Sequence, residues 1–330
     1  MAPPLIYTCP IDHTPLTPVE GGLRSEAGRF YPVACGGWDL RPGAGDDNKQ
    51  LQAEIYDAKL GEFTDFAHAH NLMLVHQRGL LDQLEVAQGD RVLEIGGHRS
   101  GTLAYLESTK GIVGSGADIA RVWVNAQNAA AQARGRGTRW VVADAEHLPF
   151  ADRSFAAVVA FDVLEHVTHL DAAVAGIARV LRPGGMLVAH MPVRDIGGSF
   201  DGLQRWWDAA DYAARQATAG HFHERMPTRL QMRTLLESKG FQVLDLRSFN
   251  VWLQPLHDHR LLPLLGRLRH RGKPREAGGT ATQAAPGASR FQRVYAKAAV
   301  PLARALTVPD RLGSLLGIGG SASFIARLPG

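Results

Sequence analysis

The stretch Arg91–Thr102, RVLEIGGHRSGT, places an apolar run directly before a turn that contains three glycines. A short run of aliphatic residues predicts a buried strand. Glycine adopts backbone conformations that other residues avoid, so Gly96, Gly97 and Gly101 predict a tight turn at the strand's end. A strand, a glycine turn and a helix in this order are typical of α/β folds that bind nucleotide-like cofactors. This stretch therefore restricts the chain to such a fold.

The segments around this turn repeat its pattern of a strand followed by a helix. The strand-like runs are Val92–Ile95, Ile112–Val113, Trp140–Val142, Ala156–Phe161 and Met186–His190. Strands that alternate with helices predict a parallel sheet covered on both faces. We also expect strands at residues 242–249 and 322–329, and helices at 51–63, 72–84, 228–241, 252–272 and 291–306.

Composition sets broad limits on the class of protein. The 330 residues are 45% hydrophobic and 21% charged, as in an ordinary globular protein, and the formal net charge is only +4. Two cysteines exclude a disulfide framework. Neither a secretory signal nor an apolar run of bilayer length is evident, so we expect a cytoplasmic protein.

Three classes of cofactor use a strand, a glycine turn and a helix. A phosphate-binding loop needs a lysine where Thr102 stands, and a dinucleotide turn needs a glycine where His98 stands. The third cofactor, S-adenosylmethionine, has no phosphate and carries two positive groups. An acidic residue such as Glu94 suits its ammonium. Asp118 and Asp144 follow the next two strands, where they suit the ribose hydroxyls and the adenine amino group.

The chain at this point resembles the class I S-adenosylmethionine-dependent methyltransferases of the type 11-like group. The resemblance covers about residues 89–249 and lies in the motifs VLEIGGHRSG, GADIA, ADAEHLPFADRSFAAVVAFDVLEHV, LRPGGMLVAHMP and LLESKGFQVLDL. It implies a Rossmann-like sheet of seven strands with helices on both faces, whose last strand runs antiparallel between its neighbours. One departure is His98, which replaces the usual middle glycine, with about one extra residue before Gly101.

The resemblance also implies a role for each cofactor-binding residue. Glu94, Gly96, Gly97 and Gly101 would line the methionine part of S-adenosylmethionine. Asp118 would bind the ribose, with Ile119 near the adenine, and Phe161 would lie beside the cofactor. Asp144 and Ala145 would bind the adenine.

The amino-terminal segment, residues 1–45, resembles a degenerate zinc-ribbon module found before some methyltransferase domains. Structural zinc requires four nitrogen or sulfur ligands, but only Cys9 occupies a ligand position. A site made from Cys9, His13 and Cys35 is the alternative; we expect a metal-free, β-rich module. The remaining predicted units are a helical lead-in at 46–88, the cofactor-binding core at 89–250, and a helical insertion, linker and final strand at 251–330.

Methyl transfer needs a general base only when the acceptor arrives protonated. The candidates are His166, which follows the fourth strand, and His221 or His223, in an insertion expected to cover the site; of these two we favour His223. Aromatic residues in the covering segments favour a hydrophobic or planar substrate: Phe200, Trp206, Trp207, Tyr212, Phe222 and Trp252. The basic helix at 255–275 predicts either contact with a membrane or a lipid-linked acceptor, or an ordinary packed helix.

We therefore expect methyl transfer to O, N or C of a small hydrophobic metabolite. The alternatives are methylation of ribosomal RNA, and a cofactor-binding protein without methyltransferase activity. Against an RNA partner stand the incomplete ribbon and the lack of basic residues interleaved with aromatics near the amino terminus. The sequence leaves the oligomeric state open.

Overall fold

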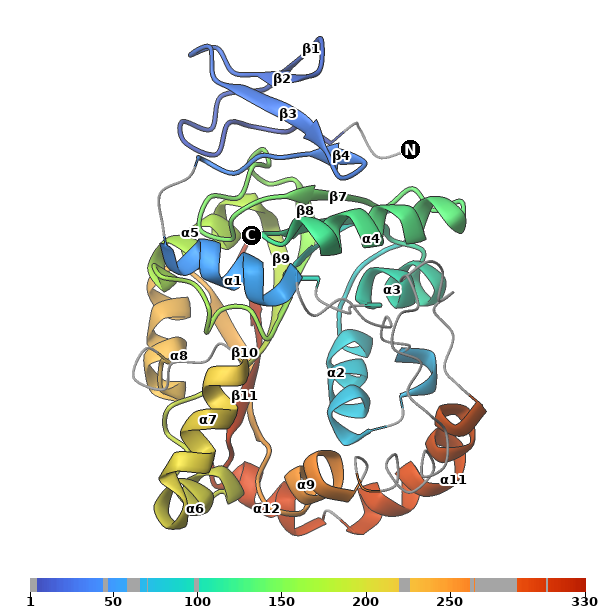
Figure 1. Ribbon diagram of the computed structural model, residues 1–330, viewed down its shortest axis with the longest axis vertical. Coiled ribbons are helices and arrows are strands. Elements are labelled where there is room, and N and C mark those ends of the chain that lie inside the picture. The colour runs from blue at the N-terminus through green and yellow to red at the C-terminus, as the bar shows by residue number, and fades with distance from the viewer. Residues whose placement is uncertain are drawn as a thin grey trace.

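The protein contains a small and a large β-sheet (Figure 1). The small sheet is antiparallel, in the order β1 (Thr17–Val19), β2 (Gly22–Arg24), β3 (Phe30–Ala34) and β4 (Gly37–Trp38). The structure is a computed structural model that describes residues 5–43, 47–57, 66–69, 71–97, 101–219, 226–261, 264, 290–306 and 308–330.

The large sheet has seven strands in the order β10-β11-β9-β8-β5-β6-β7. Strands β5 to β9 are parallel, and β11 runs antiparallel between β9 and β10. The predicted seven-stranded, Rossmann-like class I methyltransferase fold is confirmed, including the orientation of the last strand. The strands are β5 (Arg91–Ile95), β6 (Val113–Asp118), β7 (Arg139–Val142), β8 (Phe155–Phe161), β9 (Leu181–Pro192), β10 (Gln242–Phe249) and β11 (Ser321–Arg327).

Helices lie on both faces of this sheet and extend beyond one end of it (Figure 1). Helix α12 was not predicted from the sequence, and most of the helix predicted at 252–272 lies outside the described residues. The helices are α1 (Asp47–Asp57), α2 (Leu72–Asp82), α3 (Thr102–Lys110), α4 (Arg121–Ala133), α5 (Leu170–Val180), α6 (Phe200–Trp207), α7 (Ala209–Ala219), α8 (Arg229–Ser238), α9 (Leu253–Leu256) with a π-turn at His257–Leu261, α11 (Arg290–Leu306), α12 (Val308–Leu315), and a 3-10 turn at Phe66–His68.

Alternate residues of each central strand point to opposite faces, and this divides the core into two apolar clusters. Leu93 and Val158 belong to the cluster that includes residues of α5 and α8. Their neighbours Val92 and Val159 belong to the cluster that includes residues of α2, α3 and α4. Burial on both faces explains why these strands read as continuous apolar runs.

The small sheet packs against the edge of the large one. The Leu40 backbone N–H donates to the carbonyl of Val142 at 2.8 Å, and Asp39 forms a parallel bridge with the same residue. Cys9 and Tyr31 of this segment belong to the core cluster that includes α5 residues. The segment therefore protects the outer edge of β7, which would otherwise present unpaired backbone groups.

Strand β6 is longer than the sequence predicts because its glycines serve packing. Only Ile112–Val113 reads as strand-like, since Gly114, Ser115 and Gly116 lack strand propensity. A Cβ at Gly116 would lie 2.1 Å from the indole of Trp140, and one at Gly97 would lie 2.0 Å from the same ring. The fully buried indole fills the space left by these two glycines, so their missing side chains are a packing requirement.

We expect Gly116→Ala to destabilise the fold by about 1–3 kcal/mol, because the added methyl must displace a buried indole ring. The measurement is the free energy of unfolding in urea. Gly137→Ala is the matched control, since a Cβ there meets nothing within 4 Å. Equal stability of the two variants would contradict this packing role.

Candidate active site

The ends of four parallel strands surround one cleft. Its empty volume is about 630 Å³ when the part open to solvent is included. It lies at the carboxyl ends of β5, β6, β7 and β8, where the chain switches from one side of β5 to the other. Open α/β sheets bind ligands at such a switch point. Five predicted cofactor residues line this cleft: Gly96, Asp118, Ile119, Asp144 and Ala145.

Asp118 ends β6 and places its carboxylate on the wall of the cleft. Its Oδ1 accepts a hydrogen bond from the Ala120 N–H at 2.8 Å. Burial raises the pKa of Asp118 to about 6, although backbone hydrogen bonds partly oppose this shift. A raised pKa indicates that the carboxylate lacks enough donors to stabilise its charge fully. Ligand hydroxyl groups would supply such donors.

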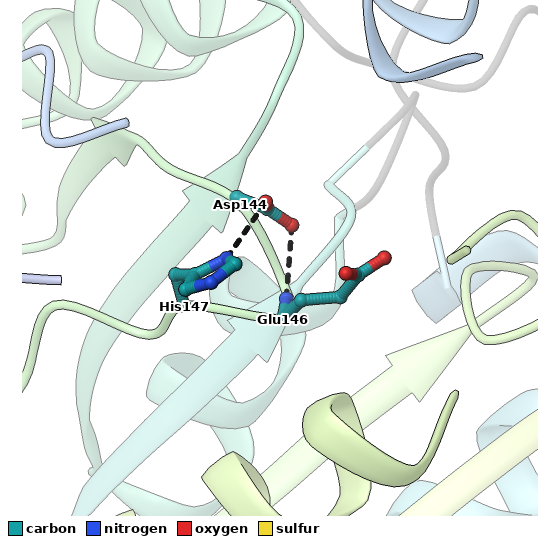
Figure 2. A group of neighbouring side chains, drawn as sticks. All are labelled: Asp144, Glu146 and His147. Carbon is teal, nitrogen blue, oxygen red and sulfur yellow. Dashed lines mark hydrogen bonds and ion pairs between the residues drawn. The ribbon is translucent and has the colours of Figure 1, made fainter. Parts of the chain in front are cut away.

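Asp144 follows β7 and is already paired with two cationic or polar side chains. Its Oδ2 lies 2.6 Å from Lys49 Nζ and 3.1 Å from His147 Nδ1, and its Oδ1 accepts from the Glu146 N–H. Figure 2 shows the carboxylate directed toward the His147 ring and the Glu146 backbone. An adenine amino group would share this carboxylate with Lys49.

Asp144, Glu146 and His147 are the one close set of three metal-ligating side chains within the described part of the chain. Lys49 Nζ also lies 2.9 Å from Glu146 Oε2, so its ammonium binds both carboxylates. The position between the two acids is thus held by the protein's own cation. Cys9, His13 and Cys35 form no such set among the described residues.

Glu146 makes contacts that join its own loop to helix α1 and to residues 168–169. Its Oε1 accepts from the backbone N–H groups of Thr168 and His169, at 2.7 and 3.0 Å, while its Oε2 faces Lys49 and the His169 ring. Burial disfavours ionisation, but the hydrogen bonds from His169 and Lys49 outweigh it and lower the pKa of Glu146 to about 2. Glu146 is therefore a structural anion that fixes the wall of the cleft.

Helix α1 extends across this cleft and supplies residues that sequence analysis did not assign to the site. Lys49, Gln52 and Tyr56 line it, and Tyr56 Oη lies 2.8 Å from His166 Nε2. The Trp123 indole N–H donates to the Tyr56 carbonyl, which fixes α1 on α4. The sequence shows only an amphipathic helix here, because the contacts join residues more than sixty positions apart.

The glycine turn packs against the protein itself. Gly96 has φ +72°, in the left-handed region, and a Cβ there would lie 2.0 Å from Val163 Cγ2. The sequence argument explained these glycines by the approach of the cofactor. Contacts with Val163 and Trp140 require Gly96 and Gly97 independently of a ligand. Gly101 precedes the first residue of α3 as its N-cap.

The other predicted site residues lie in different places. Glu94 is 2% exposed within β5, and Phe161 packs on the apolar cluster of α2, α3 and α4, so neither is part of the described lining. Next to Phe161, Asp162 and Val163 line the cleft instead. His98 and His223 lie outside the described residues. The roles of Glu94, Phe161 and His223 stay predictions.

The aromatic residues expected to cover the substrate do not line the described cleft. Trp206 and Trp207 on α6 are 83% and 54% exposed, and Tyr212 on α7 is buried. Helices α6 and α7 lie toward the end of the molecule opposite the small sheet (Figure 1). Phe222 and most of the basic stretch at 255–275 lie outside the described residues. No helix among the described residues is long and apolar enough to span a bilayer.

Comparison with known proteins identifies the domain that contains this cleft. Residues 93–189 match the family described as methyltransferase domain, a segment that runs from β5 into β9. The chain carries a class I S-adenosylmethionine-dependent methyltransferase domain.

Relatives of this methyltransferase domain include two curated proteins. The methyltransferase GfsG of Streptomyces halstedii is 34% identical over 118 residues, which are 35% of this chain and 42% of GfsG. The ubiquinone/menaquinone biosynthesis C-methyltransferase UbiE of Haemophilus ducreyi is 25% identical over 237 residues, 65% of this chain and 89% of UbiE. The chain thus spans less than half the length of GfsG.

A solved structure shares the fold of the methyltransferase. Geranyl diphosphate C-methyltransferase of Streptomyces coelicolor A3(2) superposes with a TM-score of 0.53 at 12% identity. The superposition covers 86% of this chain and 100% of that one. At this identity the likeness concerns the fold alone.

We expect stability to depend on Glu146 at low pH. Its pKa in the folded protein, about 2, lies below the ordinary 4.5. The contribution of Glu146 to the free energy of unfolding is therefore complete above about pH 4.5 and is lost as the pH falls toward about 2. Glu146→Gln should lower the free energy of unfolding by roughly 2–3 kcal/mol at neutral pH, with the difference narrowing below pH 4.5 or so.

Urea unfolding at a series of pH values measures this dependence. Glu26→Gln, at an exposed position in the turn between β2 and β3, is the control and should follow the wild type. A Glu146→Gln difference that stays constant down to the lowest pH would rule out this electrostatic role.

Proposed function

We propose that the protein transfers a methyl group from S-adenosylmethionine to a small-molecule acceptor. The observation that carries the proposal is the placement of Asp118 and Asp144 on one cleft, at the ends of adjacent strands. Ribose hydroxyls would donate to Asp118, whose raised pKa reflects too few donors. The residues present therefore fit the nucleoside half of the cofactor.

The walls of the cleft suit an adenine ring between these two carboxylates. Ala117, Ile119, Ala143 and Ala145 give it apolar surfaces, and Asp144 offers a carboxylate at the ring's edge. The adenine amino group would take part of the charge-assisted contact now made by Lys49. Helix α1 would then lie over the nucleoside, since it carries Lys49 at one end and Tyr56 at the other.

When bound, S-adenosylmethionine supplies an activated methyl group, so the chain's own task is to orient the reactants and exclude water. Tyr56 and His166, joined at 2.8 Å, close the cleft beside the end of β8. Burial raises the pKa of the Tyr56 hydroxyl, so Tyr56 stays neutral. This pair would limit the space open to the acceptor.

Two similarities support a small acceptor. UbiE is named for ubiquinone/menaquinone biosynthesis, and the solved methyltransferase that shares the fold acts on geranyl diphosphate. The cleft opens to solvent beneath α1 and has the volume that a small ligand requires. These similarities support a compact, largely apolar acceptor for this chain.

We expect Asp118→Asn to weaken binding of S-adenosylmethionine by about 10–100-fold, because each hydrogen bond to a charged group contributes about 1.5–3 kcal/mol. Isothermal titration calorimetry measures the affinity. Wild-type affinity should also fall as the pH is lowered through about 6, because Asp118 takes up a proton there. The variant should lack that dependence.

Asp171→Asn, at an exposed position on α5, is the matched control and should bind as the wild type does. Failure of the wild type to bind S-adenosylmethionine would overturn the proposal. Binding without formation of S-adenosylhomocysteine from a metabolite extract would favour the cofactor-binding alternative. Methyl incorporation into ribosomal RNA would favour the alternative of a ribosomal RNA methyltransferase.

A further inference from the structure

A second group of polar residues lies beside the cofactor cleft, at the same edge of the sheet. It contains Asp162 after β8, His190 in β9, Ser323 in β11 and His76 in α2. Sheet pairing brings the first three together, since Ser323 lies opposite His190, and the Asp162 N–H donates to the His190 carbonyl at 2.8 Å. Asp162 alone of the four lines the cleft.

Hydrogen bonds join three of these side chains, and Asp162 lies beyond hydrogen-bond distance of the third. His76 Nε2 lies 2.7 Å from Ser323 Oγ, and Ser323 Oγ lies 2.8 Å from His190 Nδ1. On the other side of the His190 ring, Nε2 faces Asp162 Oδ1 at 3.9 Å. His190 is 1% exposed, and this nitrogen makes no hydrogen bond to any residue that the structure describes. A buried ring nitrogen is thus directed at the carboxylate.

The backbone holds Asp162 in a conformation that serves this geometry. Its φ is +55°, in the left-handed region that few residues other than glycine, asparagine and aspartate adopt. Such outliers concentrate at functional sites. The side chain remains 48% accessible through the cleft, and Gln77 Nε2 donates to Oδ2 at 3.3 Å. Asp162 can therefore contact both an acceptor molecule and the buried histidine.

Given the proposed function, Asp162 lies on the acceptor side of the cofactor. Asp118 ends β6 and Asp144 follows β7, on one side of β5, whereas Asp162 follows β8 on the other side. A cofactor whose nucleoside lies at β6 and β7 would extend its other end past β5 toward β8. We propose that Asp162 is the general base of methyl transfer and that His190, Ser323 and His76 relay the acceptor's proton away from it.

The proton balance is complete. As the acceptor oxygen bonds the methyl carbon, the bond between sulfur and that carbon breaks with its electron pair left on sulfur. The acceptor's O–H bond breaks and its proton passes to Asp162. Both rings then change tautomer, which moves their protons from Nε2 to Nδ1, and the Ser323 hydroxyl turns from His190 toward His76. In this form Asp162 gives a proton to His190 Nε2, Nδ1 gives one to Ser323, and Ser323 gives one to His76 Nε2. His76 releases its Nδ1 proton, which restores the starting state.

Ser323 makes this relay reversible because a hydroxyl both donates and accepts. When it donates to His190 Nδ1, the His190 Nε2–H faces an ionised Asp162. When it donates to His76 instead, His190 Nε2 can accept from a protonated Asp162. Both forms of the base are thereby stabilised.

The charges around these groups agree with such a role. The surrounding protein partly desolvates the Asp162 carboxylate, 48% of which stays accessible, and raises its pKa to about 7, which suits a base at neutral pH. Burial lowers the pKa of His190 well below its usual value and that of His76 to about 4, so both rings are neutral carriers. The other titratable or charged groups near these residues are Glu165, Tyr56, Arg247 and Arg304.

The acceptor class follows from this chemistry. A carboxylate base is needed for a weakly acidic hydroxyl, and it is superfluous for an acceptor that is already ionised. Phe249 stacks on the His76 ring with ring centroids 3.9 Å apart, which fixes the end of the relay that lies away from the cleft lining. A weakly acidic hydroxyl, such as that of a phenol, is the acceptor that a carboxylate base fits.

The test uses the full-length protein, labelled S-adenosylmethionine and two probe acceptors, 4-methoxyphenol and the more acidic 4-nitrophenol. Asp162→Asn should lower kcat for 4-methoxyphenol by about 10²–10⁴-fold. The loss for 4-nitrophenol should be much smaller, because this phenol ionises without help. Calorimetry should give the variant a wild-type affinity for S-adenosylmethionine. A purely structural role would reduce both rates equally and overturn the proposal.

The relay has its own matched pair of variants. Ser323→Ala should lower kcat for 4-methoxyphenol about tenfold, whereas Ser321→Ala should have no effect. Ser321 is equally buried on the same face of β11, and its hydroxyl makes no hydrogen bond to a described residue. Nitrogen-15 NMR of the His190 ring should show a change of tautomer near pH 7 in the wild type and none in Asp162→Asn. An unchanged spectrum would overturn the relay.

The two proposals fail in different ways. If S-adenosylmethionine does not bind the wild type, the proposed function itself is wrong. If it binds but neither phenol is methylated, the acceptor class and the base assigned here are wrong while the cofactor site stands.

Discussion

The candidate active site depends on the point at β5 where the order of the strands reverses. After β5 the chain adds β6 and then β7 on one side, and it returns to the other side of β5 with β8 and β9. Because all five strands are parallel, their carboxyl ends open at one edge, and the loops on the two sides diverge there. The acidic residues that follow β6, β7 and β8 consequently meet in one cleft.

Similar carboxylates acquire different properties at this edge according to their partners. Glu146 accepts from two backbone N–H groups and from Lys49, so its charge is stabilised and its pKa is low. Asp118 is buried and Asp162 is partly desolvated, and the hydrogen bonds to each do not offset this loss of solvation, so their pKa values are raised. Glu146 therefore suits a structural role, while the other two retain capacity for a ligand or a proton.

Sequence analysis predicted the central sheet well because each strand has a periodic apolar signal. The segments at 140–142, 156–161 and 242–249 correspond closely to β7, β8 and β10. Strand β6 was recognised only in part, since its Gly116 is required by the Trp140 indole, a contact between distant residues. Asp118 and Asp144 could be chosen because an acid directly after a strand lies at a known edge.

Other parts of the site could not be predicted in this way. Lys49 and Tyr56 lie on a helix whose sequence shows an amphipathic pattern but not the loops that it contacts. His190 carried a signal that was overlooked, since it is a polar residue within the apolar run MLVAHMP. Asp162 follows β8 as Asp118 ends β6, so the same rule could have selected it. The partnership of His190 with Ser323 arises only when the last strand inserts beside β9.

The position of β11 between β9 and β10 connects the fold to the chemistry proposed for it. Strand β11 is formed from the final residues of the described chain, yet it pairs with β9 next to the catalytic edge. Because it runs antiparallel, its beginning, with Ser323, lies at the edge where the parallel strands end. A parallel last strand would place its start at the opposite edge, far from His190. The antiparallel strand thus completes the sheet and also joins two buried imidazoles beside the acceptor side of the cleft.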